Sequence, residues 1–323
     1  MNGLGWLPWA VGEGAFMGLA KFGHGWVGGV SPSILHIIFA AGLVGLVQMV
    51  VGYVALAHRG KAVLTRGWYL AGSLGFGFCA LVATVCAFAA FQSGARADMG
   101  ANTFIVSALA IVPAAFLGYW LFGERIGGKQ AIGLFVALAG AALVTAPALN
   151  PGNSPVWILW SLGTMLCAAT TRTIAKAMAV YGAKRNLPKL EHWAMLFWGG
   201  AAMAGLSLPI AAFKWDVVED AFSTSLWWLA LVVAVCNLVW WSCRLRAFQE
   251  LAPLCFKELP SVCAYLMVAT LGGVVMFGDA LPLSKVLGLL LFIPAFFAAQ
   301  EDLWDYCTRL TGRLFAYRLF TAG

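Results

Sequence analysis

The chain has 323 residues, of which 62% are hydrophobic and 10% charged, with a net charge of +7 and a mean hydropathy of +0.87. A soluble domain has roughly 25% charged residues, so this composition excludes a water-soluble globular protein. The basic residues are spread over short loops, which also argues against a nucleic-acid partner.

Apolar stretches recur along the whole chain, and about 20 such residues suffice for a helix to cross a bilayer. The amino terminus lacks a basic region and a small-residue cleavage site, so we expect the first stretch to stay in the mature protein. In chain order we predict transmembrane helices at about 6–28, 33–57, 67–91, 98–122, 130–148, 155–180, 191–213, 224–248, 252–278 and 283–300.

The last segment, 301–323, is short for a span and carries several charges. Its apolar residues follow helical spacing, so we expect an amphipathic helix lying on the inner leaflet. A contact between copies in an oligomer is the alternative interpretation of this segment.

Loop charge indicates the orientation of the predicted helices. One set of loops and the tail hold most of the basic residues, whereas the opposite set holds Asp216, Glu219 and Asp220 with few basic ones. Positive loops stay in the cytoplasm, so both termini are expected inside, in the cell inner membrane. The basic residues of the first set are Arg59, Lys61, Arg66, Arg125, Lys129, Lys184, Arg185, Lys189, Arg309, Arg313 and Arg318.

The sequence also resembles itself. At a fixed offset of 155 positions Gly118 matches Gly273 and Gly123 matches Gly278, and Lys21 falls on Lys176. Two apolar halves of this length are typical of a duplicated membrane transporter. An odd number of helices in each half inverts the second half. We therefore predict an all-α polytopic membrane protein of two inverted five-helix repeats, residues 1–150 and 151–300, followed by the tail 301–323.

These features resemble the drug/metabolite transporter superfamily, EamA type. The strongest match runs from Pro113 to Pro147 and includes Leu121-Phe-Gly-Glu124, Gln130-x2-Gly133 and Gly140, while the second copy is weaker. The resemblance implies a ten-helix carrier with a central cavity between the halves. It also implies alternation between inward-open and outward-open states, and export rather than import.

The Gly-Glu motif admits two interpretations. In the structural one, Gly123 and Gly278 end helices in a left-handed turn and Glu124 caps the next helix. In the functional one, Glu124 is a proton or substrate site. Gly118, Gly133 and Gly140 are interpreted as small surfaces that let helices approach closely.

Ionisable residues inside predicted spans are the candidate substrate and translocation pathway, because each costs about 2.5–3.5 kcal/mol at the bilayer centre unless a partner or a wet cavity receives it. Glu13 and Lys21 lie about 12 Å apart on one helix face, too far for direct contact. A static interhelical ion network is the main rival, and snorkelling is the alternative for Lys176 and Lys257. The candidates are Glu13, Lys21, Arg172, Lys176, Lys257 and Glu258.

Other residues of the spans are given structural roles. Lys257 and Glu258, as sequence neighbours, are expected to point in different directions and not to neutralise each other. Arg244 and Arg246 are interpreted as anchors at the cytoplasmic end. Pro260 is expected to kink its helix. The eight cysteines are expected to behave as small apolar residues, without a disulfide or metal framework.

We therefore expect a secondary transporter of a small organic metabolite, amino-acid-like or carboxylate-bearing, and not an enzyme. No phosphate-loop motif is present, so the driving force is expected to be an ion or solute gradient. The expected partners are the solute, the lipid bilayer and the coupling ion, with a homo-oligomer left open and no cofactor or metal. The alternatives are a non-transporting accessory or sensor subunit and a membrane enzyme acting on lipid-linked substrates.

Overall fold

The computed structural model describes residues 5–62, 67–95, 99–145, 156–184, 191–250, 252–278 and 280–299. Within these ranges the chain forms helices and short connections, without any strand, which confirms the all-α prediction. The predicted amphipathic segment 301–323 and Asp279, the repeat equivalent of Glu124, lie outside the described residues.

The helices follow the predicted apolar stretches closely. Residues 98–122 form three consecutive segments with a π-helical turn in the middle, and a short polar helix, α9, precedes α10. The bounds are α1 Leu7–Val30, α2 Ile34–His58, α3 Trp68–Gln92, α4 Met99–Thr103, η2 Phe104–Ala108, α5 Ile111–Phe122, α6 Gly128–Thr145, α7 Val156–Lys184, α8 His192–Ala212, α9 Trp215–Ser223, α10 Leu226–Gln249, α11 Leu254–Gly272, η4 Gly273–Phe277 and α12 Leu283–Ala299.

Six helical stretches are long and apolar enough to cross a membrane, and α6 and α12 contain shorter apolar helices. Helices α1 and α7 are long but are not among the six; they contain the candidate charges Glu13, Lys21, Arg172 and Lys176. This composition is that of a multi-pass membrane protein. The six stretches are Ile34–His58, Trp68–Gln92, Phe104–Phe122, His192–Ala212, Leu226–Gln249 and Lys257–Phe277.

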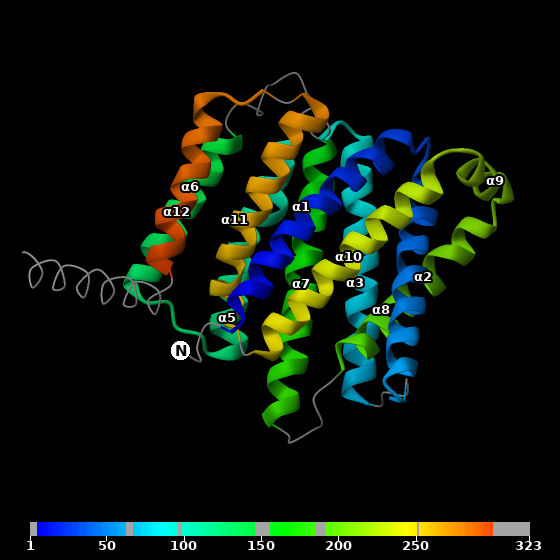
Figure 1. Ribbon diagram of the computed structural model, residues 1–323, viewed down its shortest axis with the longest axis horizontal. Helices are drawn as coiled ribbons and strands as arrows, with labels where there is room; N and C mark the ends of the chain where they lie inside the picture. Colours follow the sequence, from blue (N-terminus) through cyan, green and yellow to red (C-terminus); the bar gives the residue numbers. More distant parts are fainter. Residues whose placement is uncertain are drawn as a thin grey trace, which may run out of the picture.

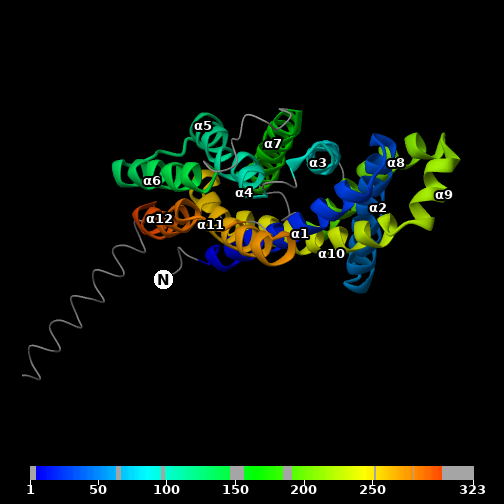
Figure 2. The ribbon, with the colours of Figure 1, turned by 90° about the horizontal axis from the view of Figure 1, so that it is seen from above.

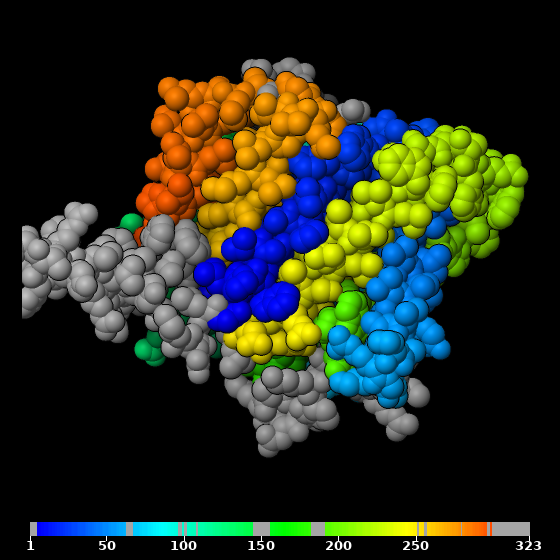
Figure 3. Space-filling view, in the orientation of Figure 1, coloured from blue at the N-terminus to red at the C-terminus, as the bar shows by residue number. Residues whose placement is uncertain are grey.

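The helices are arranged in two layers (Figures 1 and 2). In the first layer α1 packs between α10 and α11, and this layer forms the face seen in Figure 3. In the second layer α7 packs against α3 and against the α4–η2–α5 segment. The pair α6–α12 closes one side of the molecule and the pair α2–α8 the other, so that each side joins the two halves of the chain.

Glycines make the closest helix contacts possible. A Cβ atom added at Gly140 of α6 would lie 2.8 Å from the carbonyl oxygen of Gly288 on α12, which confirms Gly140 as a close-approach position. In the first layer, a Cβ at Gly14 of α1 would lie 1.9 Å from the carbonyl oxygen of Ser261 on α11. Gly118 has a different role, because a Cβ there would meet the Glu124 carboxylate at 2.7 Å.

The two ends of the layered bundle differ in charge. The basic end carries Arg59, Lys61 and Arg125 in the loops after α2 and α5 and Lys129 at the start of α6, and α7, α10 and α1 also begin or end there. The acidic end carries α9, with Asp216, Glu219 and Asp220. Helix α5 stops at the basic end at Gly123, with φ 68°, and η4 stops at the acidic end at Gly278, with φ 70°. The predicted left-handed turns are therefore confirmed.

Replacing Gly14 by alanine is expected to lower the thermal unfolding midpoint of the purified protein. The added methyl group collides with the α11 backbone, and overpacking of this kind destabilises proteins by about 1–3 kcal/mol. Gly205→Ala is the matched control, because a Cβ at Gly205 of α8 meets nothing within 4 Å. That variant is expected to keep or raise the midpoint. Equal midpoints for both variants would show that α1 and α11 are not in this close contact.

Candidate functional site

A buried ion network connects α1, α10 and α11 near the basic end. The carboxylate of Glu13 accepts a hydrogen bond from Nε of Arg244 at 2.8 Å and one from Nζ of Lys257 at 2.5 Å. All three side chains are almost completely inaccessible to solvent. The partner that Glu13 was expected to need is thus supplied by two other helices of the same layer.

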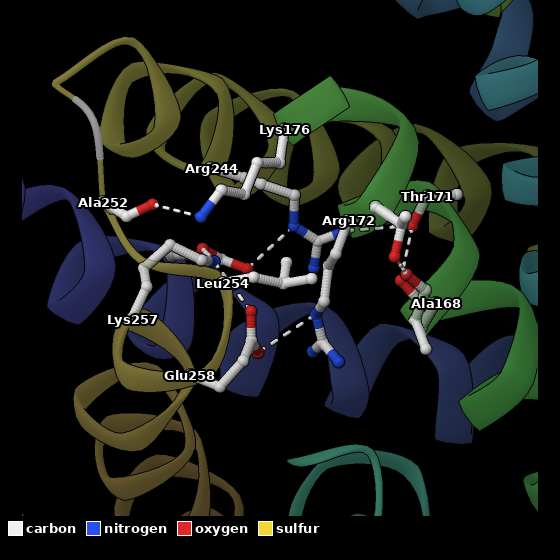
Figure 4. A network of polar contacts seen from close by, with 12 residues as sticks. Ala168, Thr171, Arg172, Lys176, Arg244, Ala252, Leu254, Lys257 and Glu258 are labelled. Carbon is white, nitrogen blue, oxygen red and sulfur yellow. Dashed lines mark hydrogen bonds and ion pairs between the residues drawn. The ribbon is translucent and has the colours of Figure 1, made fainter. Parts of the chain in front are cut away.

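The second carboxylate of the network, that of Glu258, lies between Lys257 and Arg172 (Figure 4). Its oxygens are 3.0 Å from Nζ of Lys257 and 3.0 Å from Nε of Arg172. These are ion-pair contacts rather than aligned hydrogen bonds. The expectation that Lys257 and Glu258 do not neutralise each other was wrong, because the long lysine side chain reaches back between both carboxylates.

Arg244 is the functional residue that sequence reasoning missed. It was expected to be an anchor at the helix end, but its side chain is 1% exposed and also donates from Nη1 to Thr171 Oγ1 of α7 at 3.2 Å. The signal was available: a carboxylate buried at Glu13 requires a cation, and none was assigned to it. Arg246, two residues later, lies over the ring of Trp9 instead.

A second cluster lies between this network and the basic end. Lys176 of α7 forms an ion pair with Glu124 and donates to the carbonyl of Ala252 at 3.3 Å. Glu124 accepts the backbone N–H of Leu254 at 2.9 and 3.0 Å. Glu124 is therefore a helix cap, as the structural interpretation held, but it caps α11 rather than the next helix, α6. Lys176 and Lys257 do not snorkel, since both side chains are buried.

A cavity lies beside the ion network, between the two layers. The gaps between its lining atoms total about 550 Å³, a figure that includes open solvent. Its lining is mostly apolar, with cations and hydroxyl groups among the apolar side chains. The lining residues are Met17, Lys21, His24, Ala80, Ala83, Thr84, Ala87, Val106, Thr164, Ala168, Thr171, Arg172, Trp240, Trp241, Arg244 and Tyr265.

Several hydrogen-bond donors of the cavity lining are not used. Lys21 is 2% exposed and lies 5.0 Å from the ring of Phe91, and it forms no ion pair with any described residue. Buried nitrogens that lack a hydrogen-bond partner are Nη1 of Arg172, Nη2 of Arg244, Nε1 of Trp240 and both ring nitrogens of His24. A binding site with such a surplus of donors suits a solute rich in acceptors.

The sequence-predicted residues thus fall into three places. Glu13, Arg172, Lys257 and Glu258 come together in the network, and Arg172 also lines the cavity. Lys21 lines the cavity without taking part in the network, and it lies toward the acidic end. Lys176 lies in the separate cluster with Glu124.

The two layers are joined by ion pairs and hydrogen bonds on the basic side of the cavity, and they also meet at its acidic side, where Gln92 of α3 donates to the carbonyl oxygen of Ser31 at 2.7 Å. Arg172 of α7 pairs with Glu258 of α11, and Thr171 of α7 accepts from Arg244 of α10. Nearer the basic end, Lys176 and Glu124 bind the backbone at the start of α11. Together these contacts lock the layers to each other on that side of the cavity.

Within the described part of the chain, no group of three or more His, Cys, Asp or Glu side chains is placed to hold a metal ion. The cysteines that the structure describes, Cys79, Cys86, Cys167, Cys236, Cys243 and Cys263, are free thiols.

Comparison with known proteins shows a family likeness over the first part of the chain. The model of the EamA-like transporter family matches residues 9–146, which span α1 to α6. No curated protein matches the chain. Among solved structures 28 chains are similar, and one, known from a crystal structure, has 19% sequence identity and a TM-score of 0.61 over 94% of this chain and 98% of its own. At that identity the likeness shows the fold alone.

Replacing Glu13 by glutamine is expected to destabilise the protein. It removes the carboxylate shared by Arg244 and Lys257, and breaking a buried ion pair on one side costs about 3–5 kcal/mol. Thermal unfolding followed by tryptophan fluorescence measures the effect. The control, Glu219→Gln on the exposed face of α9, is expected to stay within about 0.5 kcal/mol. If the two variants melted alike, Glu13 would not hold the network together.

Proposed function

We propose that this chain, whose residues 9–146 match the model of the EamA-like transporter family, is a membrane transporter that carries a small carboxylate-bearing organic metabolite by alternating access. The donor-lined cavity between two layers, with ion pairs locking the layers on one side of it, favours a carrier over an accessory subunit. A network of charges in a bundle without a cavity would instead favour an accessory subunit that transports nothing.

The proposed architecture is ten membrane-crossing helices in two inverted halves, 1–150 and 151–300. A twofold axis in the membrane plane would exchange α1 with α7 and α10 with α3. The packing of α1 on α10 and of α7 on α3 agrees with such an axis, as do the pairs α2–α8 and α6–α12, whose members occupy equivalent positions. The basic end is proposed to face the cytoplasm of a cell with an inner membrane, following the positive-inside rule.

In the proposed cycle the cavity is closed toward the basic end in this structure and opens there when the layers separate. Separation requires Arg172 to leave Glu258 and Arg244 to leave Thr171. A solute carboxylate bound beside the two guanidinium groups replaces the contacts that they lose, since guanidinium groups bind carboxylates in a bidentate geometry. Cargo thereby lowers the free energy of the open state relative to that of the empty protein.

The second cluster acts as an outer part of the same lock. Glu124 and Lys176 belong to the second layer, while their backbone partners Leu254 and Ala252 lie at the start of α11 in the first. Opening at the basic end releases the α11 amide from its carboxylate cap. This contact therefore contributes to the closed state without touching the solute.

The driving force is proposed to be a gradient of the solute or of a coupling ion, and the direction to be export, as the family resemblance implies. Transport in both directions across a liposome membrane measures the direction. Acidic residues of the network are the groups on which a coupling proton would act.

Purified protein in liposomes is expected to catalyse saturable counterflow of a carboxylate-bearing solute from a metabolite library. Protein-free liposomes and liposomes containing the heat-unfolded protein are the controls. If the folded protein moved no solute in either direction, the transporter proposal would fail and an accessory role would replace it.

Glu124→Gln is expected to lower counterflow about tenfold while leaving the protein folded. The neutral amide keeps the shape of the side chain but loses the ion pair with Lys176 and weakens the cap of α11, which together shift the population away from the closed state. Asp216→Asn, an exposed change on α9, is the control and is expected to transport normally. Normal transport by Glu124→Gln would remove the cap from the mechanism.

A further inference from the structure

The charges around the cavity do not balance. Four cationic side chains, those of Lys21, Arg172, Arg244 and Lys257, accompany the two carboxylates of Glu13 and Glu258 among the described residues of the cavity and its network. The surplus is two positive charges in a site enclosed by apolar helices. Charges in such surroundings are expensive unless an opposite charge reaches them, so an occupied site calls for two negative charges on the cargo.

Each carboxylate of the network already faces two cations of the protein. Glu13 is bound by Arg244 and Lys257, and Glu258 contacts the same Lys257 and Arg172. The remaining acceptors in the lining include the hydroxyl oxygens of Thr84, Thr164 and Thr171, which are neutral. An ammonium group would have to compete with these cations for the carboxylates and would also face the surplus positive charge. This arrangement disfavours an amino-acid cargo.

The surplus is divided between two places in the cavity. Lys21 lies eight residues after Glu13 on α1, a rise of about 12 Å along the helix, so it lies toward the acidic end. Arg244 contacts Glu13 directly and Arg172 contacts Glu258, which places both guanidinium groups at the basic side of the cavity. The unpartnered donor atoms follow the same division, with His24 near Lys21 and the two Nη atoms at the other side.

Between these two places the lining is carbon-rich. Met17, Val106, Trp241 and Tyr265 face the same cavity, and alanines occupy its α3 and α7 walls. A flexible carbon chain or a ring fits such a surface, whereas a string of hydroxyl groups would lose hydrogen bonds to water without replacing them.

We propose that the cavity binds a dicarboxylate without an amino group, one carboxylate beside Arg172 and Arg244 and the other beside Lys21. This inference rests on the proposed function for its transport consequence, but binding itself is independent of transport. It narrows the cargo from carboxylate-bearing metabolites in general to organic dianions, and it gives Lys21 the role of recognising the second carboxylate.

The test compares solutes of equal carbon length in three sets: succinate, butyrate and aspartate; glutarate, pentanoate and glutamate; adipate, hexanoate and 2-aminoadipate. Binding to the purified protein is read from the ligand-induced rise in the thermal unfolding midpoint, and transport from counterflow in liposomes. In the best-binding set, the dicarboxylate is expected to bind at least tenfold more tightly than the monocarboxylate, because a hydrogen bond to a charged group is lost in the latter. It is also expected to bind at least tenfold more tightly than the amino acid.

Lys21→Gln isolates the second contact. Lys21 has no ion pair with the described residues, so its replacement leaves the buried network intact. The variant is expected to bind the dicarboxylate no better than the monocarboxylate, while its affinity for the monocarboxylate stays within about twofold. Lys21→Arg is expected to restore the preference in part, and Lys214→Gln, at an exposed position of the acidic end, to leave it unchanged.

The outcomes separate the two proposals. A preference for the amino acid or the monocarboxylate, or a dicarboxylate preference that survives Lys21→Gln, overturns the dianion site even if transport occurs. Tight binding of a dicarboxylate without counterflow of any solute overturns the transporter proposal and leaves the binding site standing. Absence of both binding and flux overturns both.

Discussion

Two carboxylates buried in an apolar bundle are the constraint on which the rest of this structure depends. Glu13 and Glu258 lie away from water, so each needs cations; neighbouring helices supply them, together with Lys257 of the helix that carries Glu258. Satisfying them brings α1, α7, α10 and α11 to one point and sets the two layers against each other there. The cavity lies directly beside that point, which is why the same arginines serve both the network and the cavity wall.

Buried ion pairs contribute little net stability, because desolvation offsets most of their attraction. In the proposed cycle these ion pairs matter because they can be exchanged for contacts with the cargo. In that cycle a guanidinium group that contacts Glu258 in the empty protein binds a cargo carboxylate instead, so the lock and the proposed binding site compete for the same donors. In this account substrate recognition and opening are one event, which is the requirement for a carrier as opposed to a pore.

Local sequence patterns were sufficient for the helices, the left-handed turns at Gly123 and Gly278 and the burial of the charged residues. They were not sufficient for the partners. Glu13 and Arg244 are 231 residues apart, and no periodicity within one helix shows that they meet. The cap from Glu124 to Leu254 crosses 130 residues for the same reason. A count of the cations that each buried acid requires would have identified Arg244 as a partner of Glu13, because no other role was apparent for a buried cation on α10.

The central claim is that the layers separate at the basic end when cargo is bound, and the distance across that end tests it most directly. Spin labels at Arg125, after α5 in the second layer, and at Glu250, after α10 in the first, occupy exposed positions on opposite sides of the lock. In a background without the native cysteines, the account predicts a short inter-label distance in the empty protein and a second, longer population when the transported solute is added. A single distance that no solute changes would contradict it.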